Sequence, residues 1–196
     1  MKNNKIALIL LTLLLLISCK EEKKKTEASH EDHTTTEKAS TEKKKLSPHT
    51  SAMAMVGGAH IHIDYSSPGV RNRIIFGGLL PFDEVWQAGA HMATWIETDK
   101  DLRIQGETIP KGKYGFFVIP SAKDWTVILN ANWEQHGKDE YDEKDDVIRF
   151  KVSSSISENV QEHLEYKIEK TDERSGTMAL SWEKYSIKFP FSVIQE

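Results

Sequence analysis

Cysteine is nearly absent from this chain, since Cys19 is the single one among 196 residues. One cysteine cannot form an intramolecular disulfide, a CxxC redox pair or a thiolate metal cluster. The sequence also lacks the Gly-x-Ser-x-Gly nucleophile elbow, the His-Glu-x-x-His zinc motif and the P-loop spacing. These absences favour a non-catalytic protein and leave an enzyme as the alternative.

Positive charge is scarce beyond the N-terminal quarter. Residues 1–46 hold 10 of the 26 Lys and Arg but only 7 of the 30 Asp and Glu, which leaves a net charge of about −7 for residues 47–196. A domain with this balance and without a local Lys/Arg cluster would repel a phosphate backbone. We therefore expect no nucleic-acid partner.

The N-terminus has the pattern of a secretory signal peptide. Lys2 and Lys5 precede an apolar run over residues 6–17, which ends at Ser18 and Cys19. The run is shorter than the roughly 20 residues that span a bilayer, so it predicts a cleaved signal over residues 1–18. Residues 16–19 (Leu-Ile-Ser-Cys) resemble a bacterial lipobox, which implies acylation of Cys19, with palmitate among the acyl groups, and a membrane partner reached through that lipid.

A charged, polar stretch follows the predicted lipidation position. Residues 19–46 contain almost no large apolar side chain, so they cannot bury enough surface to offset the entropy of ordering, and we expect a disordered tether. Residues 20–22 (Lys-Glu-Glu) resemble a lipoprotein export signal. Anchoring to the cell envelope, at the outer membrane and with possible exposure at the cell surface, is the localisation that this resemblance implies.

Residues 47–196 have the length of one domain and read as an all-β fold. Short runs rich in β-branched and aromatic residues alternate with Gly, Pro, Asn and Asp, which predicts an antiparallel β-sandwich of Greek-key or jelly-roll type. The expected strands are 60–65, 93–98, 102–105, 113–119, 125–130, 147–152, 163–170, 177–182 and 185–189. One short helix is expected at 82–88, with Asp83 as its cap and Leu79, Val85 and Trp86 on its buried side.

Three motifs resemble those of a known family. Residues 65–68 form a Tyr-Ser-x-Pro strand end, residues 73–81 an Arg-x-Ile-Phe-Gly-x-Leu-x-Pro loop, and residues 86–94 a Trp-x-x-Gly-Ala-x-x-x-Thr segment. In these motifs the chain is similar to the domain of unknown function 2911 family of secreted bacterial proteins. The family pattern has Arg and Asn where this chain has Gln87 and His91. The resemblance implies a fold and a location, and it implies no reaction.

Three histidines are the candidate metal ligands. His60 and His62 alternate with Ile61 and Ile63 on a predicted strand, so both imidazoles, together with Asp64, point to one face. Two imidazoles so placed can reach one metal ion, and His91 is the candidate third ligand, with zinc or copper as the ion. The alternative is a polar strand face whose histidines bind nothing.

Met53 and Met55 alternate shortly before these histidines. Soft thioethers with histidine would suit copper. The interpretation we prefer is that an N-terminal strand places both methionines in the core.

Arg71, Arg73 and Trp133 are the candidate ligand-binding residues. The two arginines flank Asn72 near Gly69, so they could bind a carboxylate or a phosphate, or they could instead bond loop carbonyls. Trp133 could stack on a sugar or pack inward under the acidic stretch 139–146.

The first hypothesis is a lipid-anchored, non-catalytic β-sandwich that binds a small ligand or a metal ion. The alternatives are a metal-dependent hydrolase that uses the same histidines with Asp64 or Glu97 as base, and a structural envelope protein.

Overall fold

Alternating apolar residues build ten β-strands within residues 46–195, the part of the chain that the computed structural model describes. The predicted signal peptide, Cys19 and all but the last residue of the predicted tether lie outside the described residues. The strands are β1 (His49–Val56), β2 (Ala59–Ser66), β3 (Trp95–Thr98), β4 (Leu102–Ile104), β5 (Glu107–Ile109), β6 (Gly112–Ile119), β7 (Asp124–Asn130), β8 (Asp146–Ser153), β9 (Ser155–Lys170) and β10 (Ser175–Val193).

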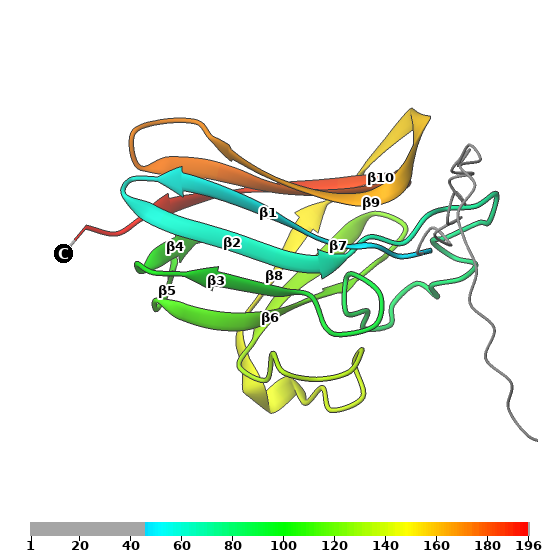
Figure 1. Cartoon of the computed structure of the whole chain (residues 1–196), viewed down its shortest axis with the longest axis horizontal. Helices are drawn as coiled ribbons and strands as arrows, with labels where there is room; N and C mark the ends of the chain where they lie inside the picture. Colours follow the sequence, from blue (N-terminus) through cyan, green and yellow to red (C-terminus); the bar gives the residue numbers. More distant parts are fainter. Residues whose placement is uncertain (1–45, 196) are drawn as a thin grey trace, which may run out of the picture. The chain divides into compact units, whose positions relative to one another are not determined.

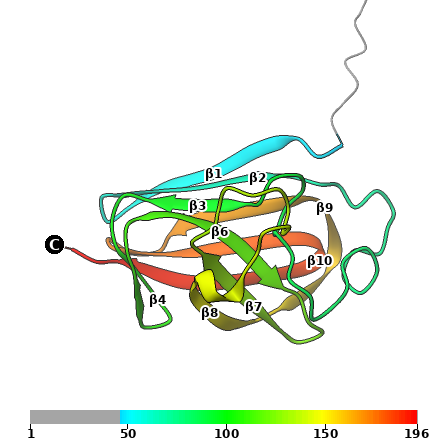
Figure 2. The ribbon, with the colours of Figure 1, turned by 90° about the horizontal axis from the view of Figure 1, so that it is seen from below.

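The strands form two antiparallel sheets. One has six strands in the order β1-β2-β3-β6-β7-β8, and the other has four in the order β5-β4-β10-β9. Figures 1 and 2 show the sheets from two sides, with the C-terminal strand β10 in the smaller sheet. The sheets bury one continuous apolar core between them, so the predicted β-sandwich is confirmed.

The predicted strands agree with the structure at most positions, because a sheet with one buried face requires apolar residues at every second position. In β2 the side chains of Ile61 and Ile63 are buried, whereas His60 is exposed and His62 half-buried. The expected face of His60, His62 and Asp64 is therefore confirmed. The strands expected at 177–182 and 185–189 are one continuous strand, β10, whose pairing with β9 shifts around Glu183.

The helix expected at 82–88 is not formed. Residues 67–94, here called the strap, connect β2 to β3 through turns, and the described residues contain one short helical turn, the 3-10 helix η1 (Glu143–Asp145). Asp83 and Ala88 have positive φ (63° and 50°), which ends any right-handed helix there, and Trp86 instead pairs its backbone with Val118. No helix in the described residues has the length and apolarity to cross a membrane.

Aromatic residues attach the strap to the core. Phe76 lies among the rings of Trp86, Trp125, Trp182 and Tyr185, with centroids 4.6 to 6.0 Å away. Trp86 is buried as predicted, whereas Leu79 is 50% exposed and does not line the core. Figure 1 shows the strap at one end of the sandwich, where β2 ends and β3 begins.

Candidate metal centre

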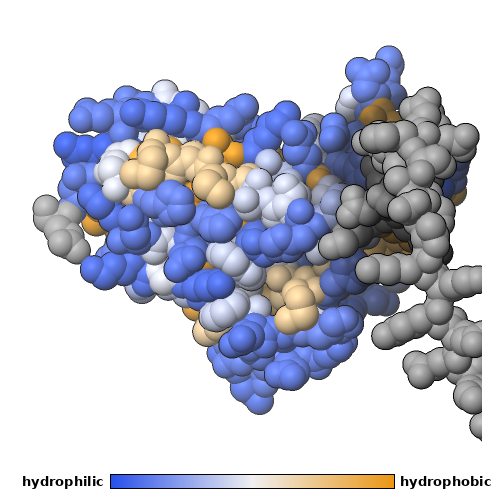
Figure 3. Space-filling view, in the orientation of Figure 1, coloured by the Kyte–Doolittle hydropathy of each residue, from blue (hydrophilic) through white to orange (hydrophobic). Residues whose placement is uncertain are grey.

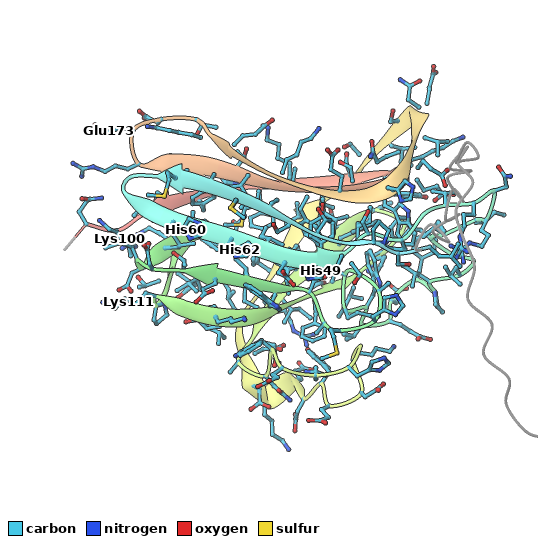
Figure 4. The ribbon with its side chains drawn as sticks, viewed as in Figure 1. His49, His60, His62, Lys100, Lys111 and Glu173 are labelled. Atoms are coloured by element: carbon cyan, nitrogen blue, oxygen red, sulfur yellow. The ribbon has the colours of Figure 1, made fainter. Side chains whose placement is uncertain are left out.

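His60 and His62 lie side by side on the outer face of the six-stranded sheet (Figure 4). Their ring centroids are 6.1 Å apart, and the ring of Trp95 meets the His62 ring edge-on at 5.0 Å. The Nε2 atom of His62 is buried and makes no hydrogen bond. A buried polar atom without a partner costs free energy, so it marks a place where a ligand would be favourable.

Met53 and Met55 lie directly opposite these two histidines. The register of β1 against β2 pairs Met53 with His62 and Met55 with His60. Both methionine side chains are more than half exposed, so the interpretation that they enter the core is wrong. The inward positions of β1 belong to Ala52 and Ala54, which pack against the core, and to the buried Val56.

The hairpin turn explains this register. Gly57 and Gly58 connect β1 to β2, and both have positive φ (57° and 76°), as a two-residue turn between antiparallel strands requires. A two-residue turn pairs its flanking residues, Val56 with Ala59, and every further pair follows by counting outward. The Gly57-Gly58 signal in the sequence is therefore the feature that locates the two Met–His pairs.

Trp95 and Lys113 form the next part of this face, and sequence reasoning missed both. The Lys113 Nζ atom lies 3.4 Å from the ring centroid of Trp95 and 3.7 Å from that of Trp133. Lys113 thus covers both rings through cation–π contacts. Trp133 is half-buried, with its ring against Trp95 and Lys113; sugar stacking on it stays a prediction.

His91 lies apart from His60 and His62. It lines a shallow pocket of about 610 Å³ with Leu46, Ser47, His49, Ser66 and Arg71. Asp64 points toward the same end of β2, where its carboxylate accepts a hydrogen bond of 2.8 Å from His49. Within residues 46–195, no three His, Cys, Asp or Glu side chains are grouped so as to hold a metal ion. The predicted set of three histidines is therefore not assembled, because His91 belongs to the strap.

The two candidate arginines have different surroundings. The Arg73 side chain donates to the carbonyls of Val70 (3.0 Å) and Gly69 (2.7 Å), so it supports the strap in the way the sequence suggested as an alternative to anion binding. Arg71 is exposed beside His49 and His91. Of these two residues, only Arg71 is placed to meet a small anion.

The acidic stretch 139–146 is fixed by one buried carboxylate. Asp146 accepts hydrogen bonds from Tyr141, from the Asn130 amide and from the Arg149 guanidinium, at 2.8 to 3.1 Å. The Asp146 carboxylate is thus already occupied by protein donors. Burial, together with the hydrogen bond to Asp146 and its charge, raises the pKa of Tyr141 to about 12, while Arg149 acts in the opposite direction.

Alkaline titration should reveal this contact. Because the folded pKa of Tyr141 lies above the usual tyrosine value of 10.0, its contribution to stability is fully present below pH 10 and is lost as the pH rises through about 12. We expect the tyrosinate absorbance of the native protein to include a component near pH 12 that the Tyr141→Phe variant lacks. The same titration in denaturant provides the control. An unchanged native curve in the variant would contradict the assignment.

The family motifs of the strap make structural contacts. Trp86 donates its indole N–H to the Gly89 carbonyl (3.1 Å), and the Thr94 hydroxyl donates to the Ala88 carbonyl (3.0 Å). A Cβ atom on Gly89 would lie 2.5 Å from the Thr94 hydroxyl, so this position needs glycine. At the variable position of the Tyr-Ser-x-Pro strand end, the Ser67 hydroxyl donates to the Leu164 carbonyl at 2.7 Å. These motifs hold the strap on the sandwich.

The comparison with known families agrees with the resemblance in these motifs. The family model described as "Protein of unknown function (DUF2911)" matches residues 47–191. The chain belongs to the DUF2911 family. No curated protein and no solved structure matches the chain. Membership in DUF2911 thus assigns the sandwich to a family and brings no activity with it.

Proposed function

We propose that this DUF2911 protein is a non-catalytic binding module of the cell envelope that binds a metal ion through His60 and His62. The buried, unpartnered Nε2 atom of His62 is the observation that carries the proposal. Imidazole is the most common protein ligand for transition metals, and it binds them through a ring nitrogen with a free lone pair. The Nε2 atom of His62 is such a nitrogen when the imidazole proton is on Nδ1, and it lies at a buried position on this face.

The spacing of the two rings is close to that of a shared ion. Imidazole nitrogens bind zinc at about 2.0 Å in tetrahedral sites, so the ring centroids of two histidines on one such ion lie roughly 5 Å apart. The 6.1 Å between His60 and His62 is longer than this, so one ring has to turn toward the other to share the ion. His60 is exposed and can adjust its ring to the ion, whereas His62 is held by Trp95.

The location of the module is part of the proposal. Residues 1–19 carry the pattern of a lipoprotein signal that ends in Cys19, and the lipid would hold the sandwich at the membrane, at the outer membrane if the cell has one. The net charge of about −7 on residues 47–196 would not attract anionic headgroups, so membrane attachment would depend on the lipid.

Metal content tests the proposal directly. The chain from residue 20 onward, with His30 and His33 replaced by alanine to remove histidines of the predicted tether, is dialysed against a mixture of first-row metals and analysed by elemental mass spectrometry. We expect about one equivalent of metal in this protein and none in His60→Ala/His62→Ala, because structural metal affinity depends on every ligand. His49→Ala/His91→Ala is the matched control, and it should keep the metal.

The outcomes separate the candidate functions. Equal metal content with and without His60 and His62, or no metal in either, would overturn the proposed function. Loss of metal in His49→Ala/His91→Ala would show that the metal ion binds near His49 and His91, at the strap end of β2. Metal-dependent hydrolysis that is lost in His62→Ala would show that the protein is an enzyme and not a binding module. Circular dichroism of each variant confirms that the sandwich is folded.

A further inference from the structure

Two thioethers and two imidazoles form a two-by-two array on the outer face of the six-stranded sheet. Met53 faces His62 and Met55 faces His60 across the β1–β2 pair, and directly opposed residues have Cβ atoms about 4.5 to 5.5 Å apart. The exposed fractions of Met53 and Met55 are 57% and 59%, so both sulfur-bearing side chains are accessible from solvent. Figure 3 shows a hydrophobic patch over β1 and β2 on this largely hydrophilic face.

This array lacks the ligands that zinc requires. Zinc sites in proteins use Cys, His, Asp or Glu, with at least three protein ligands. The described residues bring no third side chain of these types to His60 and His62. Glu97 is paired with His62 on the β3 side and is exposed, yet it does not complete such a group. On the β1 side, the side chains directly opposite the two histidines are the thioethers of Met53 and Met55.

Thioether ligands select soft cations. Methionine sulfur and imidazole together suit copper(I), whereas hard and borderline divalent ions prefer oxygen, imidazole and thiolate. We propose that the ion bound on this face is copper(I), held by Met53, Met55, His60 and His62. This inference rests on the proposed function, because it names the ion of the same site.

The surroundings of the array suit a weakly hydrated monovalent ion. Trp95 covers one side of His62, and its ring keeps water from that side of the imidazole. The Lys113 ammonium group is engaged in cation–π contacts with the rings of Trp95 and Trp133. The backbone N–H of His60 donates to Asp99 (2.8 Å), which fixes the end of β2 where the Met55–His60 pair lies.

Competition with a chromophoric copper(I) chelator under anaerobic reduction measures the affinity. The protein is the chain from residue 20 onward with His30 and His33 replaced by alanine, which has no cysteine thiol to compete for the ion. We expect about one equivalent of copper(I) to bind, and we expect Met53→Leu/Met55→Leu to weaken this binding by roughly 100-fold. Leucine keeps the size and apolarity of methionine, so folding is preserved.

Silver(I), a redox-inert soft ion, gives a second readout. Because the Trp95 ring lies against His62, silver(I) should quench part of the tryptophan fluorescence, and this part should be lost in Trp95→Phe. Met92→Leu is the matched control, since Met92 is an exposed methionine on the strap (54%), and it should keep both the copper(I) affinity and the quenching.

The results distinguish this inference from the proposed function. If copper(I) binds equally well in Met53→Leu/Met55→Leu, or if zinc binds through His60 and His62 more tightly than copper(I), the copper(I) assignment is overturned and the metal-binding module stands. If neither ion binds to the wild-type face, both proposals fall together. Copper(I) binding that depends on all four side chains would establish the site and its ion.

Discussion

Replacing Phe76 with alanine should lower the free energy of unfolding by about 3 to 5 kcal/mol, the range measured for large-to-small changes of buried aromatic residues. The Phe76 side chain is 4% exposed and lies among Trp86, Trp125, Trp182 and Tyr185. Its removal leaves a cavity in rigid aromatic surroundings that cannot collapse around it. It also removes an apolar contact that joins the strap to both sheets.

Urea denaturation followed by tryptophan fluorescence measures this effect. Ile74→Ala is the matched control, because Ile74 lies two residues away in the same loop and is 72% exposed, so its truncation should change the free energy by less than about 0.5 kcal/mol. Equal losses in the two variants would show that Phe76 has no special place in the core. A loss confined to Phe76→Ala would confirm that the family's Ile-Phe-Gly motif is structural.

The outcome for β2 shows what periodicity can predict. Ile61 and Ile63 alternate with His60 and His62, and one buried face is enough to orient all four side chains. The face of the candidate ligands was therefore predictable from the sequence. Which residues lie opposite them was also within reach, because Gly57-Gly58 is a hairpin signal and counting outward from it pairs Met55 with His60.

The interpretation of Met53 and Met55 failed for a physical reason. Methionine is apolar, and an apolar residue on a strand is normally assigned to the core. In β1 the inward positions are occupied by Ala52 and Ala54, whose small side chains pack against the apolar core. When small apolar residues alternate with large ones, alternation alone does not show which set of residues is buried. In β1 the pairing with β2 shows it, because Met53 and Met55 lie opposite the outward-facing His62 and His60.

The strap could not be predicted because its structure depends on distant partners. Five of the seven non-glycine residues with positive φ in residues 46–195 lie within it, namely Arg71, Asn72, Asp83, Ala88 and His91. Such conformations are held by contacts from elsewhere, such as the Tyr166 hydroxyl that donates to the Ala88 carbonyl at 2.7 Å. A local pattern of apolar residues at 82–88 suggested a helix, and the pairing of Trp86 with Val118 overrode it.

The strap also explains why the family resemblance and the candidate site are separate. The motif residues Phe76, Trp86, Gly89 and Thr94 contact one another or the core, and none of them lies among Met53, Met55, His60 and His62. Motifs of this kind identify the sandwich, while the array on the outer face depends on four side chains of one hairpin. We therefore expect the proposed metal binding to depend on the side chains of the β1–β2 hairpin and not on the family motifs.

Changing Cys19 to serine should abolish membrane attachment of the full-length chain. The proposed anchor is the lipid on Cys19, whose thiol would be diacylated and whose new amino group would be acylated, and serine offers no sulfur for the first of these steps. A single buried chain of an anchor contributes about 0.8 kcal/mol per CH₂, so its complete loss moves the protein from the membrane to the aqueous phase. The net negative charge of residues 47–196 gives no electrostatic attachment in compensation.

Detergent phase partitioning and labelling with a palmitate analogue check this expectation. Wild-type protein should enter the detergent phase and carry the label, and Cys19→Ser should do neither. Ser18→Ala is the matched control, because it keeps a small residue before the cysteine and should leave both readouts unchanged. Label on Cys19→Ser, or wild-type protein that stays in the aqueous phase, would overturn the lipoprotein assignment. The proposed site at His60 and His62 would stand apart from that result, because these residues lie on β2 between β1 and β3, far along the chain from Cys19.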